Sequence, residues 1–416
     1  MFSTPTRHHE ARLQPACQHL PLFDSLVSRQ YKAPADFMRI QAAILWEQGK
    51  PLSVEPAELG TPAPGEVLVE VKAAGVCHSD LHPARGDWPM KTPVVLGHEG
   101  AGIVREVGAG VTSVRPGDHV VFCWAPACGV CAPCREGRAV LCDRLEKVTY
   151  RNRLPSGASH VHARDQAVAP FLGTACFSDC VIVPEDGAIR VPADVGFDAL
   201  ATVGCAVVTG VGAVINAAQA TPGSRVVVIG AGGVGLNVMQ GAAIAGCETI
   251  VAIDVRPRPL EIAKRFGATH TISASDPSTL IPKDERSGHA TADAVRELTA
   301  GRGADFVFDT VGNSRTLTDA LAMTRKGGTV VLTGLARGDT QAAFPMFPFV
   351  MQEKRLIGSV YGSGQPRRDI PKLVSLYQQG QLKLQELVSR TYTLNGVNDA
   401  LDALASSDGA RGVITW

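Results

Sequence analysis

The sequence predicts an α/β protein in which a doubly wound parallel sheet is joined to a β-rich domain. Between about residues 208 and 361, short β-branched runs alternate with helical segments, the pattern of a parallel sheet with helices on both faces. Between residues 38 and 207, short apolar alternations are separated by Gly and Pro, as in a partly barrel-like β domain. The length of 416 residues also exceeds one typical domain.

Composition narrows the class of protein. Hydrophobic residues make up 45% of the chain, which is ample for buried cores. Lys+Arg and Asp+Glu are both 40, so the chain is formally neutral, and this argues against nucleic acid or an anionic membrane as a partner. The 11 cysteines are an odd number in a long chain, and their local spacing suits metal ligands better than disulfides. Thiolate ligands favour a reducing compartment, so we expect a cytoplasmic protein.

Two uncharged stretches, Ala199–Ala220 and Val226–Cys247, have the length of a membrane span. The second is rich in glycine and divides into a short strand, a glycine turn and a helix. We therefore interpret both stretches as segments of a protein without a membrane partner. The start of the chain, Met1–Arg12, has no apolar core, so we expect no signal peptide.

The first part of the chain is expected to be mostly β-structure. Residues 1–37 show no sustained periodicity and are predicted to form a poorly ordered extension. The predicted β-rich domain spans residues 38–207, and residues 143–172 within it are predicted to form a long polar loop beside a functional opening. The strands expected in this domain are Met38–Leu45, Glu66–Ala73, Ala101–Val107 and His119–Phe122.

The nucleotide-binding part is predicted at residues 208–361, with a helix after each of its first three strands. The buried strands expected there are Arg225–Ile229, Thr249–Ile253, Ala304–Asp309 and Thr329–Thr333. A polar insert, Ser273–Thr291, interrupts the alternation. The tail, residues 362–416, is predicted to return to the first domain with helices near Ile370–Gln379 and Val397–Ser406 and a closing strand at Gly412–Trp416.

Four cysteines in fifteen residues form the clearest motif. They are Cys128, Cys131, Cys134 and Cys142, at spacings of 3, 3 and 8. Four thiolates so close together suit a closed tetrahedral site for structural zinc. We assign this site to a lobe at residues 123–142.

A second set, Cys77, His98 and Cys205, has only three members, which suits a catalytic zinc with an open fourth position. Zinc there would polarise an alcohol oxygen and lower its pKa, so that hydride can leave the carbon. Ser79 is placed to pass the alcohol proton onward and His82 to hand it to solvent. Taken singly, each Cys or His is more often a packing residue than a ligand.

Asp80 follows Cys77 by three residues. A carboxylate at this place is expected to orient His98 from outside the ligand set, because metal-ligating histidines usually donate their second ring N–H to such a group.

The segment from Val226 to Gly235 places a GxGxxG pattern directly after a strand and at the start of a helix. Gly230 would make the tight turn, Gly232 would let the backbone approach a pyrophosphate, and Gly235 would allow close helix–strand packing. The other residues of this turn assigned to the cofactor are Gly233 and Val234. A purely structural glycine turn is the alternative.

Asp254 ends the next strand, nineteen residues after Gly235. Its carboxylate can accept hydrogen bonds from ribose hydroxyls and repel a 2′-phosphate, which favours NAD over NADP. Arg256 and Arg258 follow closely and would weaken this preference.

Together these residues resemble the zinc-dependent alcohol dehydrogenases of the medium-chain dehydrogenase/reductase family, over residues 38–416. The motifs that carry the resemblance are Gly75-Val-Cys-His-Ser-Asp80, Gly97-His-Glu-Gly-Ala-Gly102, the four cysteines, Val203-Gly-Cys205, the glycine turn and Asp254. The resemblance implies a Rossmann domain that binds NAD(P), a GroES-like catalytic domain, two zinc ions per chain, and a homodimer or homotetramer. Residues 171–178 and the segment before them resemble the class I/class III branch.

The resemblance also implies roles for single residues. Glu99 matches a carboxylate near the catalytic metal that can transiently ligate it. His78 and Arg411 match contacts to the cofactor pyrophosphate, and Thr209 matches a residue that packs near the nicotinamide. Ser79 and His82 match the proton relay.

Two positions depart from the family pattern. Relatives that oxidise glutathione adducts carry an arginine where this chain has Glu146, and Arg144 or Arg151 would have to replace it. Many relatives have a lysine near the adenosine ribose where this chain has Pro259, so altered cofactor affinity is expected.

The sequence thus predicts hydride transfer between a primary or aromatic alcohol, or its aldehyde, and NAD. An S-(hydroxymethyl)glutathione-type dehydrogenase is the second enzymatic prediction. A relative that binds NAD(P)H and serves only a structural or regulatory role is the third, although such proteins typically lack the metal ligands.

Overall fold

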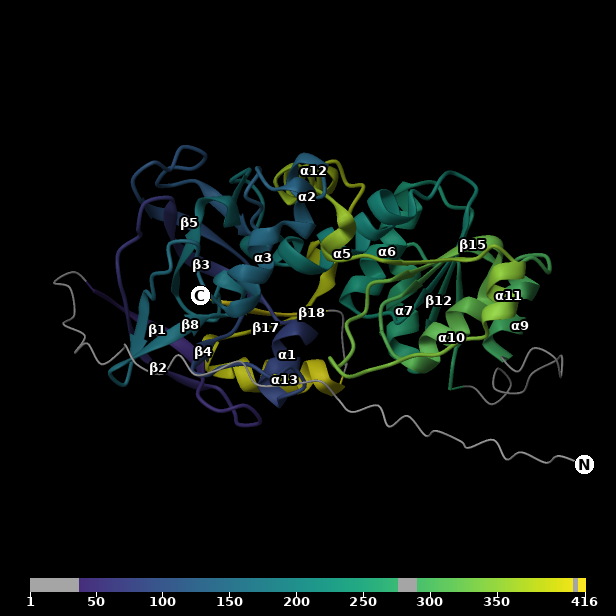
Figure 1. Ribbon diagram of the computed structural model, residues 1–416, viewed down its shortest axis with the longest axis horizontal. Helices are drawn as coiled ribbons and strands as arrows, with labels where there is room; N and C mark the ends of the chain where they lie inside the picture. The colour runs from purple at the N-terminus through teal and green to yellow at the C-terminus, as the bar shows by residue number, and fades with distance from the viewer. Residues whose placement is uncertain (1–36, 276–289, 407–410) are drawn as a thin grey trace, which may run out of the picture. The chain divides into compact units, whose positions relative to one another are not determined.

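A six-stranded parallel sheet carries one part of the fold in the computed structural model, which describes residues 37–275, 290–406 and 411–416 (Figure 1). Its strand order is β13-β12-β11-β14-β15-β16. The strands are β11 (Arg225–Ile229), β12 (Thr249–Asp254), β13 (His270–Ser273), β14 (Ala304–Asp309), β15 (Thr324–Leu332) and β16 (Arg355–Gly358). In chain order this is 3-2-1-4-5-6, so the predicted doubly wound Rossmann sheet is confirmed.

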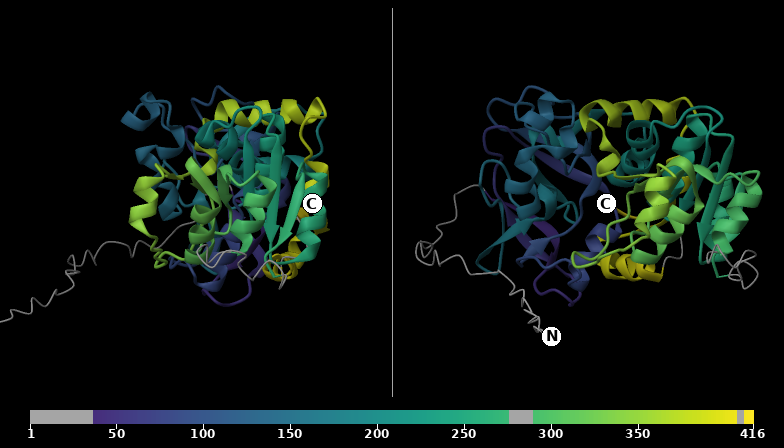
Figure 2. Two further views of the ribbon diagram at one scale, coloured as in Figure 1. Left: turned by 90° about the vertical axis from the view of Figure 1, so that its right-hand side faces the viewer. Right: turned by 45° about the vertical axis from the view of Figure 1, so that its right-hand side comes forward.

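Helices cover both faces of this sheet (Figure 2). They are α6 (Gly233–Ile244), α7 (Pro257–Arg265), α9 (Ala290–Leu298), α10 (Ser314–Met323) and α11 (Met346–Met351). In β11, Val226 and Val228 pack with the core that includes α6 and α7, while Val227 and Ile229 pack with the core that includes α9 and α10. Side chains alternate across a strand, so a strand buried on both faces is apolar throughout.

The predicted helices after the first three strands are confirmed as α6, α7 and α10. Strands β13 and β16, at the two edges of the sheet, were not predicted. Each is only four residues long, which gives too little periodicity to detect.

The β-rich part contains a closed barrel and a second, seven-stranded sheet. The barrel strands, in order, are β1 (Met38–Leu45), β2 (Ser53–Leu59), β7 (Val161–Ala163), β8 (Gln166–Pro170) and β4 (Val94–Val95). The second sheet has the order β10 (Ala188–Val191), β6 (His119–Phe122), β5 (Glu99–Val107), β3 (Glu66–Gly75), β18 (Arg411–Thr415) and β17 (Val388–Tyr392), with β9 (Cys180–Pro184) paired to β3. The predicted GroES-like β-rich architecture is confirmed.

The prediction of a long polar loop at residues 143–172 is wrong. This segment forms α3 (Asp143–Lys147), η2 (Thr149–Arg151) and the barrel strands β7 and β8. These strands have only three and five residues. All three residues of β7 are buried, while only Val168 of β8 is, so neither strand shows a clear alternation.

The two helices and the closing strand predicted for the tail are present. Helix α12 (Pro366–Gln378) and helix α13 (Val397–Ser406) precede β18, which pairs antiparallel with β3 and so joins the β-rich part. The remaining short helices are α1 (His78–Arg85), α2 (Ala132–Arg135), η1 (Ala139–Leu141), η3 (Phe171–Gly173), η4 (Glu185–Gly187), η7 (Tyr361–Ser363), η8 (Gln385–Leu387) and η9 (Leu394–Gly396).

A long apolar helix, Phe197–Ala218, links the two parts of the fold. It consists of α4 (Phe197–Ala201), η5 (Val203–Val207), α5 (Val208–Gly212) and η6 (Ala213–Ala218), of which η5 and η6 are π-helical. Among the described residues it alone is long and apolar enough to cross a membrane, but 83% of its most apolar window is buried inside the fold. It therefore has the character of a core helix.

The predicted domain boundary at residues 207 and 208 falls inside this helix and remains a prediction. Residues from Asp36 onward group as one unit by their contacts. The predicted extension, residues 1–37, lies outside the described residues except for Phe37, and so does most of the predicted insert at Ser273–Thr291.

Candidate active site

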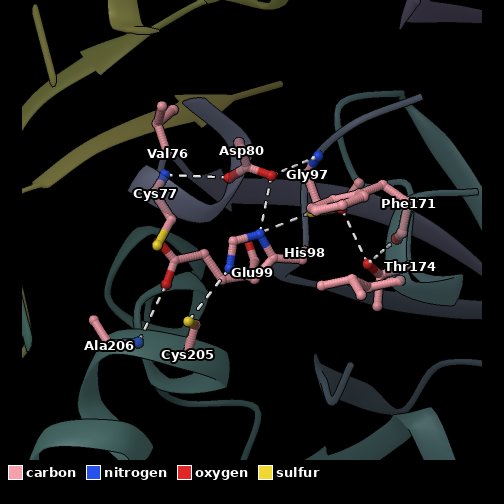
Figure 3. Close-up of polar contacts among 12 residues, drawn as sticks. Val76, Cys77, Asp80, Gly97, His98, Glu99, Phe171, Thr174, Cys205 and Ala206 are labelled. Carbon is pink, nitrogen blue, oxygen red and sulfur yellow. Dashed lines mark hydrogen bonds and ion pairs between the residues drawn. The ribbon is translucent and has the colours of Figure 1, made fainter. Parts of the chain in front are cut away.

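Three buried side chains from distant parts of the chain meet beside the long helix (Figure 3). Cys77 lies at the N-cap of α1, His98 directly precedes β5, and Cys205 lies in the π-helical turn η5. Their ligand atoms all lie within 4.8 Å of one another. The structure thus brings together the three residues that the sequence singled out.

The geometry of this group fits a zinc ion. The Nε2 atom of His98 lies 3.3 Å from the Sγ atom of Cys205. Zinc–sulfur and zinc–nitrogen bonds of usual length, in tetrahedral geometry, separate such atoms by about 3.5 Å. Three ligands leave one tetrahedral position for a substrate or water.

Asp80 ties two of these residues together from outside the ligand set. It is fully buried, and its Oδ1 atom lies 2.9 Å from His98 Nδ1 and accepts a 3.0 Å hydrogen bond from the backbone N–H of Gly97. Its Oδ2 atom accepts from the backbone N–H of Cys77 at 3.2 Å. The carboxylate therefore fixes the imidazole so that Nε2 faces Cys205.

The neighbours of the group shift its ionisation in different directions. The hydrogen bond with Cys77, together with burial, raises the pKa of Cys205 above its ordinary value. The Cys205 thiol, together with the charges of Arg411 and His98, holds the pKa of Cys77 well below its ordinary value, against the effect of burial. Burial alone would lower the pKa of His98, but the Asp80 carboxylate raises it above its ordinary value. A thiolate beside a carboxylate-oriented imidazole is a donor set suited to zinc.

Glu99 and Arg411 form a buried ion pair next to these ligands. Arg411 Nε lies 3.2 Å from Glu99 Oε1, and Arg411 also donates to the carbonyl oxygen of Val76 at 3.1 Å. Burial raises the pKa of Glu99 to about 7, against the opposing charge of Arg411. The other carboxylate oxygen of Glu99 accepts from the backbone N–H of Ala206 at 3.3 Å, beside Cys205.

The residues predicted for a proton relay lie on α1. Ser79 and His82 are half-buried and three residues apart, which places them on one side of the helix. His82 Nδ1 lies 3.1 Å from Asp87 Oδ2, and its ring stacks on Trp88 at 4.7 Å between centroids. His78 is exposed, with its ring 6.5 Å from that of His82.

The four lobe cysteines also meet the requirements of a zinc site. Cys128 and Cys134 Sγ are 4.0 Å apart, and Cys131 and Cys142 Sγ are 3.8 Å apart. Zinc–sulfur bonds of usual length in a tetrahedron separate sulfurs by about 3.8 Å. All four cysteines are free of disulfides, and backbone N–H groups of Val130 and Cys131 lower the pKa of Cys128 to about 6. This is the donor set of a closed structural site.

A cavity of about 920 Å³ lies at the carboxyl ends of β11, β12 and β14, where ligands bind to sheets of this type. Gly230, Asp254 and Arg256 line it. Gly230 has a φ of 91°, a left-handed conformation that favours glycine, and a Cβ at Gly235 would lie 1.9 Å from the carbonyl oxygen of Gly230. These two positions therefore admit only glycine without a shift of the backbone.

The rest of the predicted cofactor turn does not line this cavity, and Gly233 lies next to Arg411. Gly232 is open, since a Cβ there would have no other atom within 4 Å, while a Cβ at Gly233 would lie 3.0 Å from the Arg411 guanidinium. Val234 is half-buried, and Thr209 is buried on α5. Arg411 thus stands between the glycine turn and the three-ligand group.

Asp254 is held at the rim of the cavity. Its carboxylate accepts from the backbone N–H groups of Ala231 at 2.9 Å and Arg256 at 3.0 Å. The Arg256 side chain turns toward the same carboxylate, 3.6 Å away, and donates to the carbonyl oxygen of Ser406 at 2.8 Å.

Family models match both parts of the chain. A model described as "Alcohol dehydrogenase GroES-like domain" matches residues 63–193, and one described as "Zinc-binding dehydrogenase" matches residues 233–379. An NDMA-dependent alcohol dehydrogenase of Amycolatopsis methanolica is 39% identical, over 91% of this chain and 99% of its own length. The chain belongs to the zinc-dependent alcohol dehydrogenases.

Two further proteins are similar over most of the chain. The S-(hydroxymethyl)glutathione dehydrogenase of Paracoccus denitrificans is 35% identical, over 91% of this chain and 100% of its own. The crystal structure of benzyl alcohol dehydrogenase from Acinetobacter calcoaceticus matches with a TM-score of 0.83 and 31% identity, over 91% of this chain and 99% of the other.

Membership in the zinc-dependent alcohol dehydrogenases makes the protein an oxidoreductase that uses zinc and a nicotinamide cofactor on small alcohols or aldehydes. The prediction of an enzyme is confirmed, and the structural or regulatory alternative is not supported.

Part of the cavity at the carboxyl ends of the strands was not predicted from the sequence. Residues 313–316, which follow β14, line the same cavity as Gly230. Their position after a buried parallel strand was the available signal, because carboxyl ends of parallel strands share one edge of the sheet. Trp88, which stacks on His82, and Trp124, whose ring packs at a tilt against Tyr361, carried no such signal.

Proposed function

We propose that the protein is an NAD-linked dehydrogenase that interconverts primary or aromatic alcohols and their aldehydes. The proposal rests on the ligand atoms of Cys77, His98 and Cys205, which lie within 4.8 Å of one another as a zinc site requires. A cavity at the carboxyl ends of the parallel strands supports the cofactor part. The similarity to a benzyl alcohol dehydrogenase supports the aromatic part of the substrate range.

In this proposal Cys77, His98 and Cys205 hold the catalytic zinc, which supplies a Lewis acid that lowers the pKa of the alcohol. Ser79 accepts the hydroxyl proton, and His82 passes it to solvent. Asp80 keeps the imidazole of His98 in position. Glu99 provides, besides Asp80, a second carboxylate next to the ligands, and its ion pair with Arg411 keeps it there.

The cofactor contacts follow from the crevice. Gly230, Gly232, Gly233, Val234 and Gly235 form the turn that faces the pyrophosphate at the start of α6. Arg411 supplies positive charge near the same phosphates. His78 contacts them as a hydrogen-bond donor, because partial desolvation lowers the pKa of its imidazole. Thr209 packs near the nicotinamide.

A screen of NADH release over alcohols of different chain length and aromaticity tests the function. We expect turnover of primary and aromatic alcohols with NAD. We also expect about two zinc ions per chain, because the four lobe cysteines would hold a second ion. Zinc content of one per chain or less, or no NAD-linked turnover of any alcohol, would contradict the proposal.

A thiol-dependent formaldehyde dehydrogenase is the second candidate, favoured by the relative from Paracoccus denitrificans. Two features oppose it. Glu146 is exposed on α3, where its charge repels a glutathione carboxylate, and Arg144 is engaged with Asp186 at 2.9 Å and with the carbonyl oxygen of Pro126 at 3.0 Å. Formaldehyde oxidation measured with and without glutathione separates the two candidates, and strict dependence on glutathione would favour the second.

NAD is proposed over NADP because the Asp254 carboxylate lines the cavity near the expected ribose position. Replacing Asp254 with Ser should raise the ratio of NADP to NAD efficiency by at least about tenfold, since placing like charges together costs several kcal/mol. The readout is kcat/KM for each cofactor. Glu261→Ser, an exposed change on α7, is the control, and an unchanged ratio in Asp254→Ser would show that this carboxylate does not set the preference.

We further propose a cytoplasmic homodimer or homotetramer. The reduced lobe cysteines support the compartment, which cell fractionation checks. An apolar surface beside the edge strand β16 supports association with a second copy, because large exposed apolar patches mark interfaces. Its side chains are Met346, Phe347, Val350 and Met351, each more than half exposed. Light scattering of the purified protein tests the association, and a monomer at micromolar concentration would contradict it.

A further inference from the structure

A buried tyrosine holds the turn that carries Cys205. Tyr361 is almost fully buried, and its hydroxyl donates a 2.5 Å hydrogen bond to the carbonyl oxygen of Gly204. Gly204 and Cys205 are consecutive residues of the π-helical turn η5. Such turns are rare, and they occur frequently at functional sites.

The same turn is confined by a second close contact. A Cβ at Gly204 would lie 2.5 Å from the backbone carbonyl oxygen of Phe122, so the turn packs directly on β6. The backbone around Cys205 thus touches β6 and the hydroxyl of Tyr361. The direction of the Cys205 side chain depends on the placement of this backbone.

Tyr361 is itself held in place. Its φ of 51° is unusual for an aromatic residue and persists only where the surroundings impose it. Its ring packs on Trp124 at 4.4 Å between centroids. The next residue, Gly362, lies against the long helix, where a Cβ would meet the carbonyl oxygen of Val208 at 2.1 Å, and its own carbonyl oxygen accepts from Asn216 at 3.0 Å.

We propose that Tyr361 is a positioning residue for Cys205: its hydroxyl fixes the π-helical turn so that the thiolate faces Cys77 and His98. This inference rests on the proposed function, because it takes Cys205 as a ligand of the catalytic zinc. The residue comes from the segment directly after β16, so the sheet that binds the cofactor also positions one metal ligand.

Tyr361→Phe tests the role, because it keeps the ring and removes only the hydroxyl. We expect a chelator to remove zinc from the three-ligand site of the variant about tenfold faster than from the same site of the wild type. This is the usual scale of effect when a contact outside the ligand set is lost. The four-cysteine site in the same chain should release zinc at an unchanged rate. Cobalt substituted at the three-ligand site should show shifted d–d absorption bands in the variant.

Tyr377→Phe is the matched control, since Tyr377 is half-buried on α12 and its hydroxyl makes no hydrogen bond to the described part of the chain. Equal release rates and cobalt spectra in Tyr361→Phe and the wild type would overturn the proposal. Faster release from both sites would overturn it too, by showing general destabilisation. A wild-type chain that binds only the four-cysteine zinc would overturn the proposed function along with it.

Discussion

Replacement of Cys77 with Ala should reduce NAD-linked alcohol oxidation by at least about 1000-fold. Lewis-acid stabilisation by a metal is worth several kcal/mol, and each 1.36 kcal/mol corresponds to about a tenfold change in rate. Zinc content should fall from about two to about one per chain, because the four lobe cysteines do not include Cys77. The measurements are kcat/KM for a primary alcohol and metal analysis of the same sample.

Cys247→Ala serves as the control for this prediction. Cys247 is half-buried between α6 and β12, and burial raises its pKa to about 11, so it is a neutral thiol outside both cysteine groups. We expect the control to keep both zinc ions and most of its activity. If Cys77→Ala keeps wild-type turnover, the three-ligand group is not the catalytic centre.

The parts of the site that sequence analysis found are those with local signals. The lobe cysteines are 3, 3 and 8 residues apart, and Gly230 and Gly235 flank the junction of a strand and a helix, so short-range spacing identified them. Cys205 is different, because it lies 107 residues from His98, and the sequence there is a plain apolar helix. Its assignment rested on completing a three-ligand set with Cys77 and His98, which the family resemblance then matched, and the structure places it next to His98.

What the sequence could not show are contacts set by tertiary packing. The hydroxyl of Tyr361 reaches Gly204 across 157 residues, and no periodicity marks either position. Arg411 connects Glu99 to the glycine turn only because β18 pairs with β3. The barrel strands β7 and β8 were missed for a related reason. Pairing with β2 and β4 stabilises them as strands, and their own composition does not indicate it.

Asp80→Asn should weaken zinc binding at the three-ligand site by about 10-fold to 100-fold, the range found for partners of metal-ligating histidines. The Asp80 carboxylate faces three hydrogen-bond donors. They are the backbone N–H groups of Cys77 and Gly97 and the Nδ1 atom of His98. An amide has one acceptor oxygen, and its NH₂ group would face one of these donors without a partner. The negative charge that favours His98 Nδ1–H is lost as well.

Asp118→Asn is the matched control, because its carboxylate accepts a backbone N–H from Arg115 at 3.0 Å but lies away from both metal groups. We expect competition with a chelator to show weaker zinc retention only in Asp80→Asn, and activity to recover in part when zinc is added in excess. Added zinc restores occupancy but not the orientation of the imidazole, so the recovered kcat should remain below that of the wild type. Zinc affinity and kcat equal to wild type in Asp80→Asn would show that the buried carboxylate serves only to hold α1 against the loop before β5.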